Sequence, residues 1–416
     1  MPLGKATGVP ISSGLRASFL LPLSLTGVSY SRMNTQISLS RRRFMGGMAA
    51  ILGSVGLEPA LCLSASGAAD QPVVQAGGAD YDSLAKLCFN ENPYAPSPAV
   101  LEAMTKAFQY ANRYGYPDHG ITREIATYHG VDPDNVLLGA GSTEILEAAD
   151  MAFLAGRKKA VGVEPTFSTV YEFAIGLSAG AIRLPLLPDH NADIPALIKT
   201  TCENQSDVGF VYLCNPNNPT GVVVKKQQIK QLVEGIPEHI PVLIDEAYHH
   251  FVEDPDYASS VQFVRDGRPV IIARTFSKIA ALAGLRLGYA IAPAALIDRM
   301  RPFTGNMHVS VVTKWGGVAA LKDSAGQNEV RTKILATRKK TTSQLKALGY
   351  DVLPSEANFF MVNLRRPVMP VISAFRQKGI LVGRPFPPMH DYLRVSVGTP
   401  DEMERFMAAF KEILVA

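Results

Sequence analysis

The chain has 416 residues, of which 47% are hydrophobic and 19% are charged, so it can bury a large core. Its net charge of +4 comes from residues 1–68, which alone carry +5, and the remainder carries −1. The remainder therefore lacks the general basic field that binds nucleic acid, and no nucleic-acid partner is expected. The four cysteines show no CxxC pair and no metal-ligand spacing, so no metal site and no disulfide framework are expected. We expect the three cysteines after the leader to be buried as small apolar side chains: Cys88, Cys202 and Cys214.

The N-terminal segment is similar to a twin-arginine export signal. Ser40-Arg41-Arg42-Arg43-Phe44-Met45 precedes an apolar stretch from Met45 to Leu57 and small residues from Ser64 to Ala69. The apolar stretch is too short and glycine-rich for a membrane span. We therefore expect residues 1–68 to be a largely disordered leader, so that the protein is periplasmic or exported and meets the membrane only through the export machinery. If the leader is not used, the protein is cytoplasmic and the segment is a basic tail.

From about Val136, short β-branched runs alternate with helical patterns. This alternation predicts an α/β fold with a mostly parallel sheet covered by helices on both faces. The expected strands are Val136–Leu138, Ala160–Val163, Gly209–Leu213, Val242–Asp245, Val270–Arg274 and Gly288–Ala292. The expected helices between them include Glu144–Leu154 and Gln227–Val233. Ligands of such sheets bind in the loops that follow the carboxyl ends of the strands.

The pattern changes after about Pro302 and predicts a smaller α+β domain. A long helical stretch is expected over Val311–Leu348, followed by Phe359–Leu364, a helix near Val371–Lys378, a strand over Tyr392–Val397 and a last helix from Asp401. We therefore divide the chain into a leader (1–68), an N-terminal arm that also forms part of the small domain (69–112), a large domain (113–301) and a small C-terminal domain (302–416).

A lysine, an aspartate and an anion-binding loop occupy the loops where a ligand is expected. Ser277-Lys278 follows one strand, and Asp245 ends another, where an unpaired buried carboxylate is costly. Gly139-Ala140-Gly141-Ser142-Thr143-Glu144 follows a third strand and opens a helix, so its free N–H groups suit a phosphate. The loop lacks the third glycine of the dinucleotide fingerprint, which disfavours a nicotinamide cofactor.

Six motifs in fixed order resemble the fold-type I pyridoxal-phosphate enzymes, specifically the class I/II aminotransferases and their histidinol-phosphate aminotransferase branch. The resemblance runs from about Asn90 to about Thr399. It rests on Asn90-Glu91-Asn92-Pro93-Tyr94, Tyr116-Pro117-Asp118, Asn215 to Gly221, Asp245 to Tyr248, Ser277-Lys278 and Leu393-Arg394-Val395. It implies pyridoxal 5'-phosphate as cofactor and transfer of an amino group between an amino acid, or a histidinol-phosphate-like amine, and a 2-oxo acid. It also implies a homodimer with shared active sites.

The resemblance assigns most cofactor contacts to single residues. Lys278 is the lysine that forms an imine with the cofactor and later moves the proton of the substrate's α carbon. Asp245 pairs with the pyridine nitrogen, Tyr248 and Asn215 reach the phenolic oxygen, and Phe167 stacks on the ring, where relatives often carry tyrosine. The phosphate is held by Gly141, Ser142, Thr143, Ser277 and Arg286. Tyr116, or its neighbour Tyr114, reaches the phosphate bound by the other subunit.

The substrate contacts are implied in the same way. Arg394 is the expected clamp for a substrate anion because its planar fork suits a carboxylate or phosphate. Tyr94 lines the same pocket, and Arg384 helps to grip a substrate phosphate, although an extra glycine, Gly383, shifts it from the family pattern. A lyase or decarboxylase would use the same lysine and aspartate and stays an alternative. A non-catalytic binding protein predicts erosion of Lys278 or Asp245, and both are present.

Overall fold

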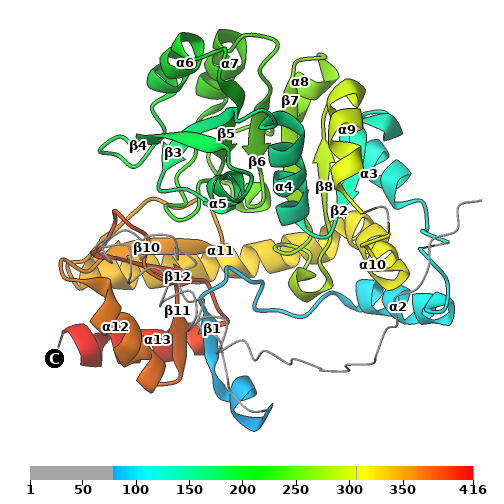
Figure 1. The fold of residues 1–416 in the computed structure, drawn as a ribbon. Coiled ribbons are helices and arrows are strands. Elements are labelled where there is room, and N and C mark those ends of the chain that lie inside the picture. Colours follow the sequence, from blue (N-terminus) through cyan, green and yellow to red (C-terminus); the bar gives the residue numbers. More distant parts are fainter. Residues whose placement is uncertain (1–77, 116, 306, 416) are drawn as a thin grey trace, which may run out of the picture. The chain divides into compact units, whose positions relative to one another are not determined.

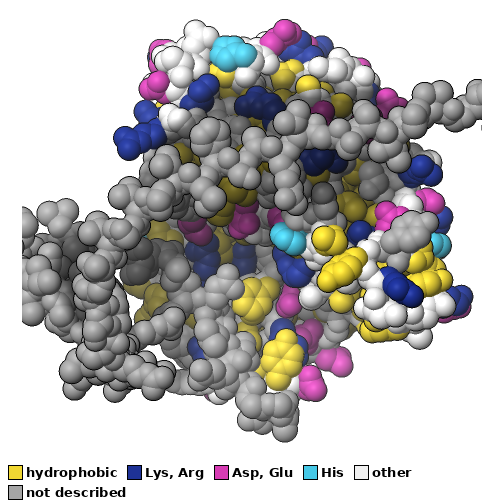
Figure 2. Space-filling model, turned by 45° about the vertical axis from the view of Figure 1, so that its right-hand side comes forward, with side chains coloured by type: hydrophobic (Ala, Val, Ile, Leu, Met, Phe, Trp, Pro, Cys, Tyr) yellow, Lys and Arg dark blue, Asp and Glu magenta, His cyan; other side chains and the backbone are white. Residues whose placement is uncertain are grey.

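The computed structural model describes residues 78–415 except 116 and 306, and these residues form one compact unit. The predicted leader and Tyr116 lie outside the described residues. In the described part no helix is both long and apolar enough to cross a membrane. On the face drawn in Figure 2, Lys and Arg side chains are interspersed with Asp and Glu side chains. Cys88 and Cys214 are buried as expected, whereas Cys202 is exposed, so the burial prediction was wrong for that thiol.

The main sheet has seven strands in the order β2-β8-β7-β6-β5-β3-β4 (Figure 1). Only β8 is antiparallel to its neighbours, which confirms the mostly parallel α/β sheet. The strands are β2 (Val136–Gly139), β3 (Lys159–Glu164), β4 (Gly180–Pro185), β5 (Val208–Cys214), β6 (Val242–Asp245), β7 (Val270–Thr275) and β8 (Gly288–Ile291). Strand β4 was not predicted, because it is a half-exposed edge strand that begins with glycine and ends with proline.

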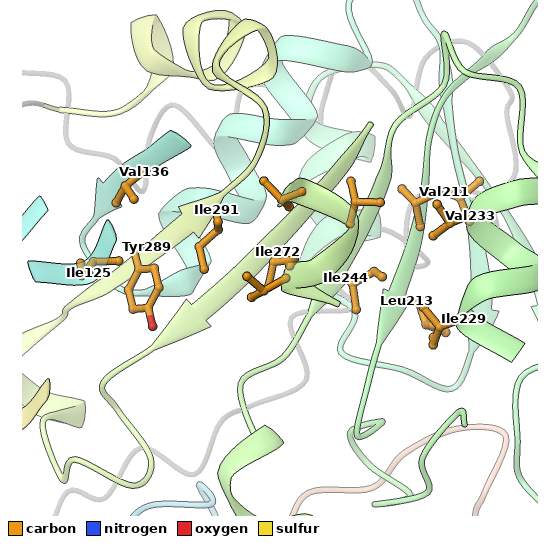
Figure 3. Packing of buried hydrophobic residues seen from close by; sticks show 14 of the residues in the cluster. Ile125, Val136, Val211, Leu213, Ile229, Val233, Ile244, Ile272, Tyr289 and Ile291 are labelled. Atoms are coloured by element: carbon orange, nitrogen blue, oxygen red, sulfur yellow. The ribbon is translucent and has the colours of Figure 1, made fainter. Parts of the chain in front are cut away.

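Helices cover both faces of this sheet, because successive residues of its strands point to opposite sides. In β5, Val211 and Leu213 pack against Ile229 and Val233 of α7 (Figure 3), whereas Phe210 and Tyr212 join the cluster on the other face. The first face is covered by α3 (Ile121–His129), α6 (Ile194–Glu203), α7 (Lys226–Gly235) and α8 (Val261–Arg265). The second face is covered by α4 (Ser142–Phe153), α5 (Thr169–Gly176) and α9 (Ala294–Met300).

Asp150 of α4 is an unusual member of the second face. Its side chain is fully buried, and among the described residues neither carboxylate oxygen has a hydrogen-bond partner. Desolvation, and then the nearby Glu147, raise the pKa of Asp150 to about 8. The carboxyl group is therefore held neutral in an apolar setting near physiological pH.

A second core lies around two small sheets. Antiparallel strands β12 (Tyr392–Ser396), β10 (Phe359–Asn363) and β9 (Asp351–Val352) form one, and β1 (Ala85–Leu87) pairs in parallel with β11 (Ile380–Val382) to form the other. Their helices are α11 (Ser324–Ala347), α12 (Val368–Gln377) and α13 (Pro400–Leu414). Helices α12 and α13 pack through the stacked rings of Phe375 and Phe406, and α11 contributes Ile334 and Leu345 to the same core. The pairing of β1 with β11 brings the N-terminal arm into this second core. The four domain boundaries themselves stay a prediction.

The predicted helical stretch over Val311–Leu348 is confirmed, and the structure divides it between two helices. Helix α10 (Val311–Lys322) ends before Asp323, whose side chain accepts the N–H of Gly326 at 3.0 Å and caps α11. Val318 of α10 belongs to the core of the main sheet, beside Val100 of α2 (Pro98–Ala107). Short 3-10 helices complete the described chain: η2 (Gly78–Ser83), η3 (Phe108–Tyr110), η4 (Pro133–Asn135), η5 (His249–Phe251), η6 (Ala283–Leu285) and η7 (Arg301–Phe303).

Candidate active site

Asp245 ends β6 in the middle of the main sheet, and no cation of the part of the chain that the structure describes is bonded to it. It is 2% exposed, and the N–H of Ala247, 3.1 Å from Oδ1, is the single hydrogen bond that its carboxylate receives from the described residues. Desolvation raises the pKa of Asp245 to about 7, against the opposing effects of this hydrogen bond and of Lys278. A buried carboxylate with so few partners suits a cationic or N–H-bearing ligand.

Lys278 follows the neighbouring strand β7, so the order of the sheet brings it near Asp245. Its Nζ donates to the carbonyl oxygen of Phe89 at 3.1 Å and lies 5.6 Å from the ring centroid of Tyr248. Desolvation, and then the cation of Arg394, lower the pKa of Lys278 to about 8. A larger share of the amine is therefore neutral and nucleophilic near pH 8 than in an exposed lysine.

An anion-binding cradle lies at the N-terminus of α4, where Ser142 and Thr143 form the first turn. Gly141 precedes them with φ of 84°, and a Cβ there would collide with the guanidinium of Arg286. Arg286 also donates to Ser277 Oγ at 3.4 Å, so the five residues assigned to the phosphate meet in one place. Glu144, which the sequence did not single out, accepts the N–H of Ala140 at 2.5 Å and fixes the turn. Together these residues offer a cation, hydroxyls and helix N–H groups to one phosphate.

The structure of the loop after β5 changes the assignment of Asn215 as the asparagine that acts beside Tyr248. The side chain of Asn215 is used twice by the backbone of Val224: its Nδ2 donates to the carbonyl oxygen at 3.0 Å, and its Oδ1 accepts the N–H at 2.8 Å. Asn218 instead has its Nδ2 3.4 Å from the hydroxyl of Tyr248, so it replaces Asn215 as the asparagine beside that tyrosine. The motif holds three asparagines within four residues, and only the fold of the loop decides which of them faces the pocket.

Arg394 of β12 lies near Tyr248 and is 7% exposed. Its Nη1 donates to Asn218 Oδ1 at 2.6 Å, and its Nη2 donates to the carbonyl oxygen of Cys88 at 2.5 Å, whereas its buried Nε has no partner among the described residues. Desolvation, and then the neighbouring Arg384, lower the pKa of Arg394 to about 10, although Tyr248 opposes this effect. A buried guanidinium without a carboxylate partner is a binding site for an anion.

Comparison with known proteins identifies the family. Residues 82–410 match the family model of aminotransferase class I and II. The chain is 34% identical over 338 residues to histidinol-phosphate aminotransferase 2 of Carboxydothermus hydrogenoformans, which covers 80% of this chain and 91% of that protein. It is 35% identical over 335 residues to the histidinol-phosphate aminotransferase of Moorella thermoacetica, which covers 79% and 85%. The chain belongs to the class I and II aminotransferases.

Solved structures agree with this family assignment. A putative histidinol-phosphate aminotransferase from Erwinia carotovora atroseptica matches with a TM-score of 0.76 at 31% identity, over 80% of this chain and 97% of that one. The histidinol-phosphate aminotransferase of Sinorhizobium meliloti in complex with pyridoxal-5'-phosphate has the same fold, with a TM-score of 0.75 at 24% identity, over 83% and 97%. This aminotransferase is therefore a pyridoxal-phosphate-dependent transaminase.

The residues of the aminotransferase fit this cofactor on two observations. The collision between a Cβ at Gly141 and Arg286 shows that cradle and cation approach each other closely enough to share one phosphate. The under-bonded carboxylate of Asp245 lies near Lys278, so one buried anion and one amine are available to the two ends of the pyridine ring. The phosphate would be held by the cradle, the ring nitrogen by Asp245 and the aldehyde carbon by Lys278.

Arg384 lies near Arg394 in spite of the extra glycine. The guanidinium carbons of Arg384 and Arg394 lie 4.5 and 4.6 Å from the centroid of the Phe386 ring. Desolvation lowers the pKa of Arg384, whereas Glu172 of α5 opposes this effect. Two guanidinium cations therefore contact the ring of Phe386, and the apolar side chains of Met361 and Met389 pack against the same ring.

The remaining predicted contacts lie farther from this centre or outside the described residues. Tyr94 packs on the second core, and Nζ of Lys333 in α11 lies 5.5 Å from the centroid of its ring. Among the described residues, no hydrogen bond or ring contact joins Tyr94 to Lys278, Asp245 or Arg394. Phe167 is half-buried between β3 and α5, and its carbonyl oxygen accepts from Tyr212 at 3.2 Å. Its stacking on the cofactor stays a prediction, as does the role of Tyr116.

Proposed function

We propose that this transaminase takes its amino group from a donor that combines an anionic group with an aromatic or otherwise apolar side chain, and passes it to a 2-oxo acid. The observation that carries the proposal is the pair Arg384 and Arg394 on the ring of Phe386, beside apolar side chains. Histidinol phosphate and the aromatic amino acids both have these two parts. The histidinol-phosphate aminotransferases among the relatives support the first of them.

The side chains divide the work between them. Pyridoxal 5'-phosphate, when bound, supplies the electron sink that stabilises negative charge on the substrate's α carbon. Asp245 keeps the ring nitrogen protonated, and the cradle at Gly141 orients the phosphate. Lys278, with its lowered pKa, takes the proton from the α carbon of the donor. The same amine would then deliver this proton to the C4′ carbon of the cofactor. Arg394 holds the anion of the donor so that the α carbon faces Lys278.

The donor can be identified from the absorbance of the purified protein. The yellow colour of the bound cofactor should bleach when histidinol phosphate or an aromatic amino acid is added, and return when a 2-oxo acid follows. Bleaching by only one of the two donor types would name the substrate class. No bleaching by any anionic donor would contradict the proposal, and product release without bleaching would favour a lyase.

We propose further that the active unit is a homodimer in which Tyr116 or Tyr114 reaches the neighbouring site. The support is a set of exposed apolar side chains close to this segment, namely Leu101, Phe108 and Tyr114, the last of which is 88% exposed. The carbonyl oxygen of Pro117 accepts from Trp315 Nε1 at 2.8 Å, which anchors the segment on α10.

Mixing two inactive variants tests the shared site. Lys278→Ala and Tyr116→Phe chains, refolded together, should form hybrid dimers that contain one intact site and recover activity above either variant alone. The same mixture with Tyr114→Phe decides which tyrosine is shared. A monomer in light scattering, or no recovery with either tyrosine variant, would contradict the proposal.

We propose, finally, that residues 1–68 export the folded protein through the twin-arginine route. The support is the order of a basic, an apolar and a small-residue segment. Replacement of Arg41 and Arg42 by lysine should leave the protein in the cytoplasm, whereas the native protein should appear shortened in the periplasm. Full-length native protein in the cytoplasmic fraction would refute export.

A further inference from the structure

The amide of Asn90, in the N-terminal arm, contacts the hydroxyl of Tyr248. Its Nδ2 lies 3.1 Å from the hydroxyl oxygen, and the Nδ2 of Asn218 lies 3.4 Å from the same atom. Asn90 is 1% exposed and has φ of 54°, in the left-handed region that asparagine tolerates better than most residues. A buried side chain in this backbone conformation, held against a site tyrosine, suggests a role beyond packing.

The hydrogen bonds around Asn90 fix which end of its amide faces Tyr248. The backbone N–H of Asn90 donates to Ser396 Oγ at 2.8 Å, so Ser396 is the acceptor there. The hydroxyl proton of Ser396 is then free to donate to Asn90 Oδ1, 2.9 Å away. With Oδ1 facing Ser396, the N–H groups of Nδ2 are left to face Tyr248.

The amide of Asn218 is oriented by a similar argument. Arg394 has only donors, and its Nη1 lies 2.6 Å from Asn218 Oδ1, so Nδ2 of Asn218 also faces Tyr248. The oxygen of Tyr248 thus accepts from two amides. None of the described residues accepts the proton of its hydroxyl, and burial raises the pKa of Tyr248, which keeps that proton in place.

We propose that Asn90 is a positioning residue that makes Tyr248 a hydrogen-bond donor to the phenolic oxygen of the cofactor. The inference rests on the proposed function of the site. Asn90 fills one acceptor position of the tyrosine oxygen and Asn218 the other, so the hydroxyl proton points away from both amides and is available to the cofactor oxygen. The N-terminal arm therefore controls the polarity of a group that contacts the cofactor.

Two variants remove this control in different ways. Asn90→Asp replaces the donor by an acceptor, so Tyr248 turns its proton toward the arm, and Asn90→Gly removes the side chain at a φ that glycine adopts freely. In the aspartate variant the phenolic oxygen loses its donor, whereas in the glycine variant the hydroxyl proton of Tyr248 is no longer confined to one direction and donates to the phenolic oxygen for less of the time. The pH midpoint at which the bound cofactor changes its absorbance should then move upward by about half to one pH unit, more for aspartate than for glycine.

A double-variant cycle decides whether Asn90 acts through Tyr248. Tyr248→Phe alone should also raise the midpoint, and Asn90→Gly added to Tyr248→Phe should cause no further shift. Additive shifts, or an unchanged midpoint in both Asn90 variants, would overturn the proposal. Asn92→Ala is the matched control, because Asn92 binds the arm to the carbonyl oxygen of Ile279 and does not contact Tyr248.

Measurements on Asn92→Ala and on the native protein distinguish failure of this inference from failure of the proposed function. If Asn92→Ala shifts the midpoint as far as Asn90→Gly does, loosening of the arm explains the effect and the proposal is wrong. If the native protein binds no pyridoxal phosphate and shows no colour, the proposed function itself fails. A coloured native protein with unshifted Asn90 variants refutes this inference alone.

Discussion

The phosphate end and the substrate end of the active site are built in different ways. At the phosphate end, Ser142 and Ser277 follow their strands by a few residues, and the main sheet brings them together through the order of its strands. At the substrate end, Arg394 binds the carbonyl oxygen of Cys88, 306 residues away in the chain, and Asn218 of the main-sheet region. Within one chain the main sheet therefore assembles the first end, whereas the second end also depends on docking of the N-terminal arm.

Lys278 stands between the two ends, and its loss should have the largest effect. Lys278→Ala should lower the transamination rate by roughly 10⁴-fold, because both imine formation and proton transfer require the amine. Activity and absorbance measurements should show an inactive protein without the yellow colour. An unchanged melting temperature would show that the fold is intact, and a variant that stays yellow after dialysis would contradict the assignment.

Arg394→Gln should affect the substrate end and spare the phosphate end. Loss of a buried guanidinium that binds an anion should lower kcat/KM for anionic donors by about 10²- to 10³-fold. The dissociation constant of pyridoxal phosphate, measured by titration, should stay within a few-fold of the native value. An equal loss of cofactor affinity would show that the two ends are not independent.

Gly141→Ala should weaken cofactor binding at the phosphate end and spare the substrate end. The added Cβ meets Arg286 at a φ of 84°, so cofactor affinity should fall by about 5- to 100-fold while the KM of the donor changes little. Gly156→Ala is the matched control, since Gly156 has φ of 76° with open space around its Cβ. If both variants lose cofactor equally, backbone strain rather than the collision is responsible.

Asp150→Asn tests the stability of the sheet region that carries the phosphate end. The pKa of Asp150 is about 8 in the folded chain and about 3.9 in the unfolded chain, so unfolding releases a proton between these values. Native stability should therefore fall as pH rises from about 4 to about 8, and the variant should escape this loss. The melting temperature of Asp150→Asn should exceed that of the native protein at pH 8 but not at pH 4. If the melting temperatures of the two proteins change in parallel with pH, the prediction is wrong.

The smallest expected effect comes from the electrostatic interaction between Arg394 at the substrate end and the amine of Lys278. Loading of the cofactor-free protein with pyridoxal phosphate needs the neutral amine of Lys278, so its rate should rise with pH up to a midpoint at about 8. Because Arg394 contributes to lowering this pKa, Arg394→Gln should move the midpoint upward by a few tenths of a pH unit. An unchanged midpoint would show that burial alone sets the pKa of Lys278.

The residues assigned to the phosphate end lie close together, as expected for side chains at strand ends within recognisable loops, and their binding of phosphate stays a prediction. Strand β6 was predicted with its bounds, and Asp245 with it. The substrate end could not be predicted to the same depth, because Asn218 and Asn215 differ only in how one loop folds. Asn90 and Glu144 were missed as individual residues for a related reason: their partners, Tyr248 and the Ala140 N–H, are known only once the chain is folded.

The break between α10 and α11 was missed because helical periodicity continues across it. A single side chain, Asp323, ends the continuity by capping the second helix. Its signal was an aspartate three residues before Gly326, and such a cap is weak evidence inside a long helical pattern.

The arm touches Arg394 and Lys278 through the carbonyl oxygens of Cys88 and Phe89 rather than through their side chains. Any residue supplies the same carbonyl, so the exposed Phe89 can change identity without changing its contact, whereas the buried Cys88 can be replaced only by a side chain of similar size. Random substitution at positions 88 and 89 would therefore be a poor way to search for new donor specificity. Insertions or deletions that shift the path of residues 85–92 would move both carbonyls at once, and a library built on loop length would explore the pocket more effectively.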